Sequence, residues 1–137
     1  MANKKDKKYG GIYYIKVLDT NYDIYIDNDF TYLDSIDADG ITDNLLKTMH
    51  IRNTFLNSIY EDKHSAELEM KRILRHELTH AFIYECGLSG NGFDKEQWPI
   101  SESLTEFIAL QFDKLSNLFN ESYNIVREIK EKSVKEK

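Results

Sequence analysis

The sequence HELTH at positions 76–80 places two histidines four residues apart, with a glutamate directly after the first. On a helix, residues four apart lie about 40° apart around the axis and one turn along it, so His76 and His80 project from one face. Their ring nitrogens can then converge on one metal ion. Glu77, about 100° from His76, is badly placed to bind that metal but well placed to contact a water bound to it. The pattern predicts a zinc ion bound by His76 and His80, with Glu77 as general base.

A helix must carry this motif, and the sequence predicts one from Ser65 to about Glu85. This segment contains no Gly or Pro and is rich in good helix formers. Gly87 is suited to end the helix. The motif fixes only three positions, so a solvated helix with two unrelated histidines remains an alternative. Apolar neighbours favour a packed helix and hence the metal site: Leu74, Leu78, Ala81 and Phe82.

A catalytic zinc also needs a third protein ligand and an open position for water. No histidine follows His80, and Cys86 falls about 600° around the helix from it, away from the site face. A carboxylate from a neighbouring helix is therefore expected. The sequence predicts a second helix from roughly Ser101 to Phe119, and Glu102 and Glu106 lie one turn apart on one of its faces.

A HELTH helix followed by a Glu-bearing helix resembles the gluzincin branch of zinc metallopeptidases. The run LRHELTHAFIYECGL…ESLTEFIA is similar to small phage- and prophage-associated zinc peptidases related to the ImmA/IrrE group, and the resemblance covers roughly residues 40–119. It implies that Glu102 is the third zinc ligand and that Glu106 hydrogen-bonds the far nitrogen of His76. Gluzincins have Asp at the position of Glu106, so the reverse assignment of the two glutamates remains open. Ser103 and Glu106 also match a capping box, which would give Glu106 a purely structural role.

Gluzincins bind substrate as an added strand on the edge strand before the zinc helix, and the resemblance assigns this role to the predicted strand 46–55. They also usually supply a side chain that stabilises the oxyanion. The downstream candidates here are Tyr123 and Arg127, whereas Tyr84 is assigned to core packing. His50 and His64 are expected at the surface.

The predicted fold class is α+β, a minimal zincin-like domain in which a small sheet of about three strands packs on the zinc helix, with a second and a third helix. The sequence DADG at 37–40 predicts a turn. The predicted strands span 12–18, 22–27 and 46–55, and the third helix spans 121–132. The predicted domain boundaries are a basic flexible tail at 1–10, a single domain at 11–132 and a frayed end at 133–137.

Composition narrows the expected function. The 137 residues carry a formal net charge of −6, which makes nucleic acid an unexpected partner. The single cysteine, the lack of a long apolar run and the lack of a secretory signal predict a cytoplasmic protein that does not bind membranes.

The expected activity is that of a zinc metalloendopeptidase acting on an intracellular protein or peptide, and the resemblance suggests a repressor-like regulator as substrate. A zinc-stabilised binding or regulatory module with little catalysis is the alternative, and a metal-free α+β domain is a third possibility. The oligomeric state is not predicted.

Overall fold

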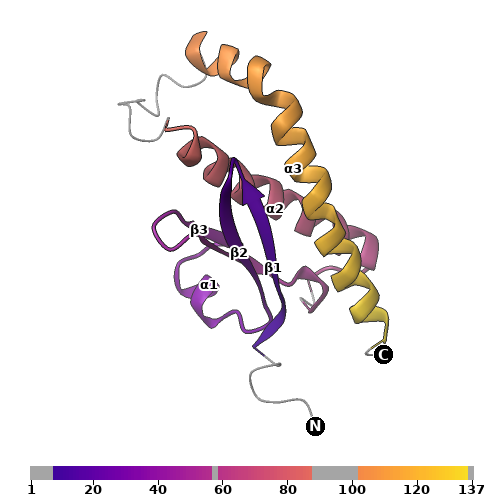
Figure 1. Cartoon of the computed structure of the whole chain (residues 1–137). Coiled ribbons are helices and arrows are strands. Elements are labelled where there is room, and N and C mark those ends of the chain that lie inside the picture. The colour runs from indigo at the N-terminus through magenta and orange to yellow at the C-terminus, as the bar shows by residue number, and fades with distance from the viewer. Residues whose placement is uncertain (1–7, 57–58, 88–101, 136–137) are drawn as a thin grey trace.

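The computed structural model describes residues 8–56, 59–87 and 102–135, without the side chains of 102–110 and 135. It has the α+β architecture predicted from the sequence, with a mixed four-stranded sheet and three α-helices (Figure 1). In chain order the elements are β1 (Tyr9–Val17), β2 (Thr20–Asp27), α1 (Thr31–Ser35), β3 (Gly40–Asp43), β4 (Thr48–Arg52), a 3₁₀ turn η1 (Thr54–Leu56), α2 (Lys63–Glu85) and α3 (Glu102–Lys135).

The sheet has the strand order β1-β2-β4-β3. β1 and β2 form an antiparallel hairpin whose two turn residues, Leu18 and Asp19, both have left-handed φ angles of 46° and 71°. Such angles match the right-handed twist of the strands they connect. β4 then pairs parallel with β2 and antiparallel with β3. The parallel pair requires a crossover, and α1 and β3 lie within it.

The sheet corrects two predictions. It has four strands rather than about three, because Gly40–Asp43 forms β3 where the sequence suggested only a turn and a loop. The third predicted strand, 46–55, is shortened to β4 at Thr48–Arg52 and lies inside the sheet, so it is not the edge strand. β3 was missed because four residues are too few to show a periodic pattern.

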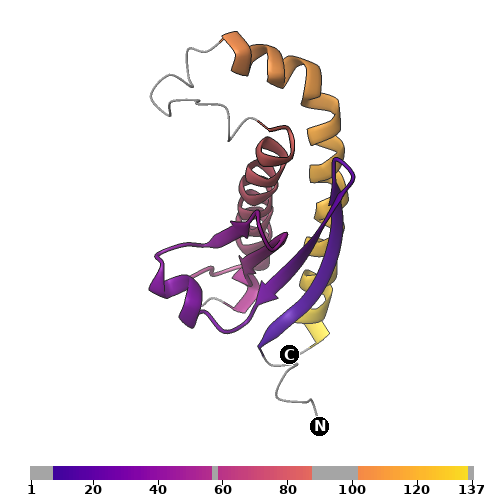
Figure 2. The ribbon, with the colours of Figure 1, turned by 60° about the vertical axis from the view of Figure 1, so that its left-hand side comes forward.

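One face of the sheet carries the hydrophobic core. α2 contacts β1, β3 and β4, while α3 lies beside α2 and contacts β1 (Figure 2). The four apolar neighbours of the histidine motif predicted to pack are all fully buried, which confirms α2 as the central helix of the core. They meet inward-facing side chains of β2 and β4: Ile24, Ile26, Met49 and Ile51.

The two C-terminal helices predicted at 101–119 and 121–132 are one continuous helix, α3. The sequence around Asn120 contains no Gly or Pro. The buried face of α3 continues past Asn120, with Leu118 before it and Ser122, Ile125 and Val126 after it, so packing favours one helix over two.

The ordered elements also extend beyond the predicted boundaries. β1 begins at Tyr9, and α3 continues to Lys135. No helix in the described ranges is both long enough and apolar enough to cross a membrane.

Candidate metal centre

Capping interactions fix both ends of the helix that carries the motif. α2 begins at Lys63, two residues earlier than predicted, because Asp62 is its N-cap. The Asp62 carboxylate accepts a hydrogen bond of 2.7 Å from the Ser65 amide. At the other end Gly87 has a φ of +77°, the left-handed conformation expected of a residue that ends a helix.

A polar cluster joins the last turn of α2 to the sheet. Glu85 accepts hydrogen bonds from the Thr20 hydroxyl at 2.9 Å and from the Tyr22 hydroxyl and the Lys47 ammonium, both at 2.6 Å. Burial, together with the bond to Glu85, raises the pKa of Tyr22 above its ordinary value. The neutral phenol is thus kept as a donor, and α2 is fixed against the β1–β2 hairpin.

His76 and His80 project together from the exposed side of α2. Their Nε2 atoms are 3.0 Å apart, and their rings are nearly perpendicular, with centroids 4.7 Å apart. Two imidazole nitrogens bound to one tetrahedral zinc at 2.0–2.1 Å would lie about 3.3 Å apart. The spacing therefore fits a shared zinc ion, and these two nitrogens are the ones that would hold it.

A third ligand is not present near the pair among the described side chains, which contain no group of three His, Cys, Asp or Glu residues able to hold a metal. The side chains of Glu102 and Glu106 lie outside that description. Their backbone forms the first turns of α3, which extend beyond α2 (Figure 1). Glu102 lies about 30 Å along the helix axis from Tyr123, the residue that contacts Arg75 beside the motif. The structure thus brings His76, His80 and Glu77 together but does not bring the start of α3 to them.

Glu77 differs from its neighbours in the motif because it is buried, with 5% of its surface exposed. Its Oε1 accepts a hydrogen bond of 3.0 Å from the Thr42 hydroxyl on β3. The stem of Glu77 also packs closely on β3. A Cβ added to Gly40 would lie 3.1 Å from Glu77 Cγ.

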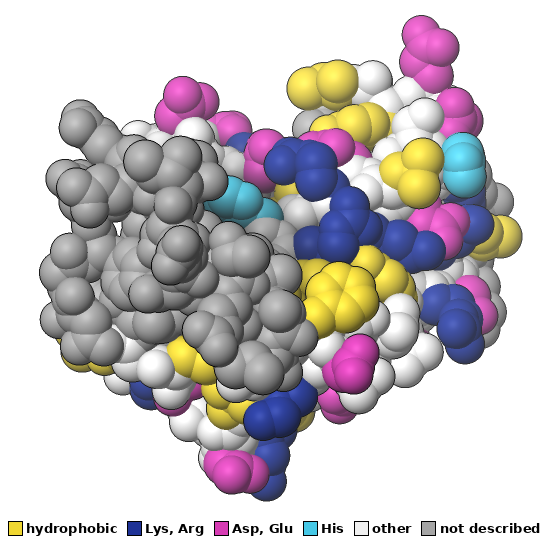
Figure 3. Space-filling view, turned by 90° about the horizontal axis from the view of Figure 1, so that it is seen from above, with side chains coloured by type: hydrophobic (Ala, Val, Ile, Leu, Met, Phe, Trp, Pro, Cys, Tyr) yellow, Lys and Arg dark blue, Asp and Glu magenta, His cyan; other side chains and the backbone are white. Residues whose placement is uncertain are grey.

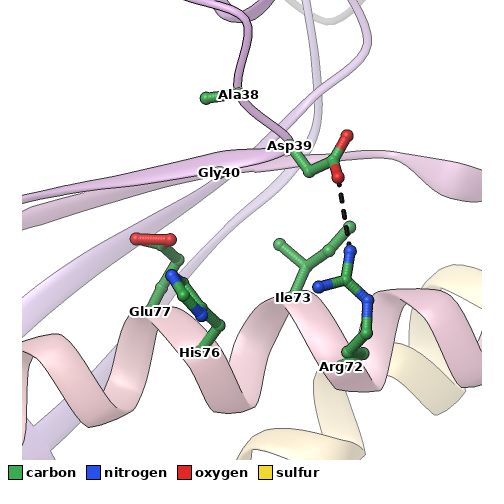
Figure 4. A pocket seen from close by; sticks show the side chains of 7 residues that line it. All are labelled: Ala38, Asp39, Gly40, Arg72, Ile73, His76 and Glu77. Atoms are coloured by element: carbon green, nitrogen blue, oxygen red, sulfur yellow. Dashed lines mark hydrogen bonds and ion pairs between the residues drawn. The ribbon is translucent and has the colours of Figure 1, made fainter.

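A groove runs between β3 and α2, and the motif forms one wall of it. One part, of about 190 Å³, is bounded by Asp39 and Gly40 at the start of β3 and by Arg72, Ile73, His76 and Glu77 on the helix (Figure 4). The other part, of about 270 Å³, continues past Thr42 and Asn44 to His80. Gly40, His76 and Glu77 line both parts. An ion pair of 3.3 Å between Arg72 and Asp39 crosses the first part.

Of the two downstream candidates for oxyanion stabilisation, Tyr123 already has other contacts. The Tyr123 hydroxyl accepts a hydrogen bond of 3.1 Å from Arg75, and the Lys71 ammonium lies 5.1 Å from its ring centroid. Figure 3 shows Lys and Arg side chains gathered on one face of the molecule, which also carries exposed histidine. Arg127 is exposed on α3. Tyr84, expected in the core, is half-buried with the Lys47 ammonium 4.5 Å from its ring centroid.

The other two histidines were both expected at the surface, and only His64 is exposed. His50 is half-buried on the sheet face opposite α2. Its Nδ1 lies 2.9 Å from the carboxylate of Asp27, and its ring stacks on Tyr25 with centroids 4.8 Å apart. His50 therefore lies at the surface on the outer face of the sheet, as expected, but a cross-strand carboxylate and an aromatic neighbour hold its ring against the sheet, so that it is only partly exposed.

Sequence reasoning missed every groove residue that comes from β3 and the turn after it, namely Gly40, Ile41, Thr42 and Asn44. These residues are separated from the motif by more than thirty positions. Their only signal in the sequence is the β-favouring pair Ile41-Thr42 after a glycine, which is too weak to define a strand.

Comparison with known proteins adds no assignment: no family model matches the sequence, and neither the curated proteins nor the solved structures yield a significant match.

Proposed function

We propose that this protein is a zinc-dependent metallopeptidase that hydrolyses peptide bonds in the groove between β3 and α2. The observation that carries the proposal is the 3.0 Å approach of the His76 and His80 Nε2 atoms beside the buried carboxylate of Glu77. If the two histidines were unrelated residues on a solvated helix, there would be no reason for Glu77 to be buried while both imidazoles are exposed.

The chain's own groups have separate roles in this mechanism. His76 and His80 would hold the metal, which when bound would lower the pKa of a water ligand and polarise a carbonyl. Glu77 accepts the proton of the attacking water and later passes it to the leaving amine. Glu102 is the proposed third ligand and Glu106 the partner of His76. For Glu102 to reach the histidines, the first part of α3 must fold back toward α2.

The substrate is proposed to bind as an added strand on β3. The Arg52 amide donates to the Asp39 carbonyl at 2.9 Å, so residues 39, 41 and 43 pair with β4. The backbone groups of Gly40 and Thr42 therefore point to the other edge of β3, along which the groove runs. We therefore assign to β3 the substrate-binding role that the resemblance had assigned to 46–55.

The resemblance to ImmA/IrrE-like peptidases of phages and prophages supports an intracellular protein substrate, such as a repressor-like regulator. This assignment is by analogy, because a shared arrangement of site residues does not fix a substrate.

The first test is the zinc content of protein purified without added metal, for the parent, Glu102→Ala and Glu106→Ala. We expect about one zinc per chain in the parent and in Glu106→Ala, and loss of zinc in Glu102→Ala. Retention of zinc in both variants would leave the histidine pair in place but contradict Glu102 as ligand. A parent that takes up no zinc, even after remetallation, would contradict the proposed function.

A second candidate is a zinc-stabilised binding module with little catalysis. It is favoured by the β3–β4 turn beyond Asn44, where Leu45 and Leu46 are 86% and 73% exposed. Asp43 accepts hydrogen bonds of 2.9 Å from both leucine amides, so the turn presents these apolar side chains in a fixed shape. Partner binding that survives Glu77→Gln but is lost on zinc removal would favour this function over proteolysis.

A further inference from the structure

β3 contacts Glu77 at two separate points, one on its stem and one on its carboxylate. At Gly40 the strand lies so close that an added Cβ would be 3.0 Å from Ile73 Cγ2 and 3.1 Å from Glu77 Cγ. Two residues on, the Thr42 hydroxyl lies 3.0 Å from Glu77 Oε1 and 3.2 Å from the Glu77 carbonyl oxygen. The hydroxyl has one proton, and the shorter of its two contacts is the one to the carboxylate.

This contact restricts a side chain that otherwise has several rotamers. Glu77 lines both parts of the groove, beside His76 in one and beside both histidines in the other. With Oε1 held toward β3, the carboxylate is kept in one orientation at the edge of the histidine face. Without that bond, the carboxylate could turn toward a metal held by His76 and His80, where it would compete with a water for a ligand position.

We propose that Thr42 is a positioning residue for Glu77, so that the strand that receives the substrate also sets the orientation of the general base. The inference rests on the proposed function, because it assumes a metal on His76 and His80. The backbone of Thr42 faces the substrate edge, while its side chain faces α2. Substrate pairing and base orientation therefore depend on the position of the same residue.

The test compares Thr42→Val, which keeps the shape but removes the donor, with Thr42→Ser, which keeps the donor. Thr48→Val is the matched control, since Thr48 lies on β4 with its side chain on the opposite face of the sheet from Met49 and α2. Each variant is loaded with zinc for kinetics on a quenched fluorescent peptide selected with the parent from a random peptide library. Each is also loaded with Co²⁺, whose visible absorption reports coordination geometry.

We expect metal content equal to the parent in all variants. Thr42→Val should lower kcat about 10- to 100-fold with little change in KM, because the base is misplaced while the substrate edge is kept. Its Co²⁺ spectrum should change as the Glu77 carboxylate enters the coordination sphere. Thr42→Ser and Thr48→Val should match the parent in both measurements.

The outcomes separate this inference from the proposed function. A Thr42→Val protein with the parent's kcat and Co²⁺ spectrum, or a Thr42→Ser protein as impaired as Thr42→Val, contradicts the positioning role alone. If the parent binds metal but cleaves no peptide, the proposed peptidase activity is contradicted. The Co²⁺ spectra of the variants then still show whether Thr42 holds the Glu77 carboxylate in its orientation. A parent that binds no metal contradicts both.

Discussion

Glu77 and the histidines on its helix occupy opposite environments within one turn. The imidazoles are exposed, and the carboxylate is almost fully buried between Gly40 and Thr42. A helix gives this division directly, since successive residues differ by about 100°. The proposed general base packs against the strand, and the two proposed metal ligands are exposed at the groove.

At this scale the first prediction concerns Glu77→Gln. The amide keeps the shape of the side chain but cannot accept a proton from water. We expect peptide hydrolysis to fall at least about 100-fold while zinc content stays at the parent's value. The measurement pairs turnover of a parent-selected peptide with metal analysis, and unchanged turnover would contradict Glu77 as general base.

The second prediction concerns the metal ligands. His80→Ala removes one of two nitrogens that lie 3.0 Å apart, so zinc should be lost together with activity. His64→Ala is the matched control, because His64 is exposed near the start of α2 and well away from the motif. Equal zinc content in the two variants would contradict a zinc site formed by His76 and His80.

Individual residues were only partly predictable from the sequence. The positions of His76, Glu77 and His80 follow from helix periodicity, which is local. The hydroxyl of Thr42 reaches Glu77 only through tertiary packing, and no local pattern encodes that distance. The same applies to His50, whose partner Asp27 lies on a neighbouring strand.

Among the elements, β3 has a larger role than its four residues suggest, because it forms the outer edge of the sheet and one wall of the groove. Its close approach to α2 at Gly40 gives the third prediction. Gly40→Ala forces the strand and helix apart by a few tenths of an ångström and should lower the free energy of unfolding by about 1–3 kcal/mol. Denaturant unfolding measures this, and an unchanged midpoint would show that the strand moves freely.

The packing of α2 against α3 provides the fourth prediction. The Lys130 ammonium lies 2.6 Å from Glu67, and this bond, with a smaller effect of Lys71, holds the pKa of the Glu67 carboxyl below its ordinary value. A lowered folded-state pKa adds stability above the unfolded pKa, and that stability is lost as the pH falls through the folded-state value.

Lys130→Met should therefore lower the free energy of unfolding by about 0.5 kcal/mol at neutral pH, a small value because both side chains are partly exposed. The difference from the parent should shrink progressively as the pH falls below about 4. Urea unfolding at several pH values measures it, with Lys16→Met on the exposed face of β1 as control. A difference that persists at low pH would indicate lost packing instead.

The continuity of α3 and the identity of the third ligand are linked. Two helices separated near Asn120 would let the Glu102-bearing segment lie across α2, whereas the one continuous helix carries it past the motif. Helix period and composition cannot distinguish these cases, because both give the same apolar stripe. In this structure α3 is a single helix, because its buried face packs against α2 and β1.

For the whole molecule, the fold class followed from the sequence while the layout of the sheet did not. Alternating apolar residues in β2 and the long apolar face of α2 predict an α+β domain with a central helix. Strand order depends on which distant segments pair, and here β4 enters between β2 and β3. Because of that arrangement, the edge strand beside the motif is β3 and not the strand predicted at 46–55.

The fifth prediction is a global effect of the metal. Zinc that binds only the folded chain should stabilise it by about 2.7 kcal/mol at a free concentration 100 times its dissociation constant. Thermal unfolding with and without chelator should show this shift in the parent and not in His80→Ala. A parent whose melting temperature is the same under both conditions would favour a metal-free domain.

The single parallel seam between β2 and β4 has a consequence for the order of folding. The β1–β2 and β3–β4 pairs are joined by short turns, so each can close within microseconds of the start of folding. The seam joins residues such as Ile24 and Met49 and cannot form until the intervening chain has closed a much longer loop. The rate-limiting step should therefore be the docking of two preformed hairpins. Stopped-flow refolding would then show that substitutions at the seam slow folding, while those at the hairpin turns mainly speed unfolding.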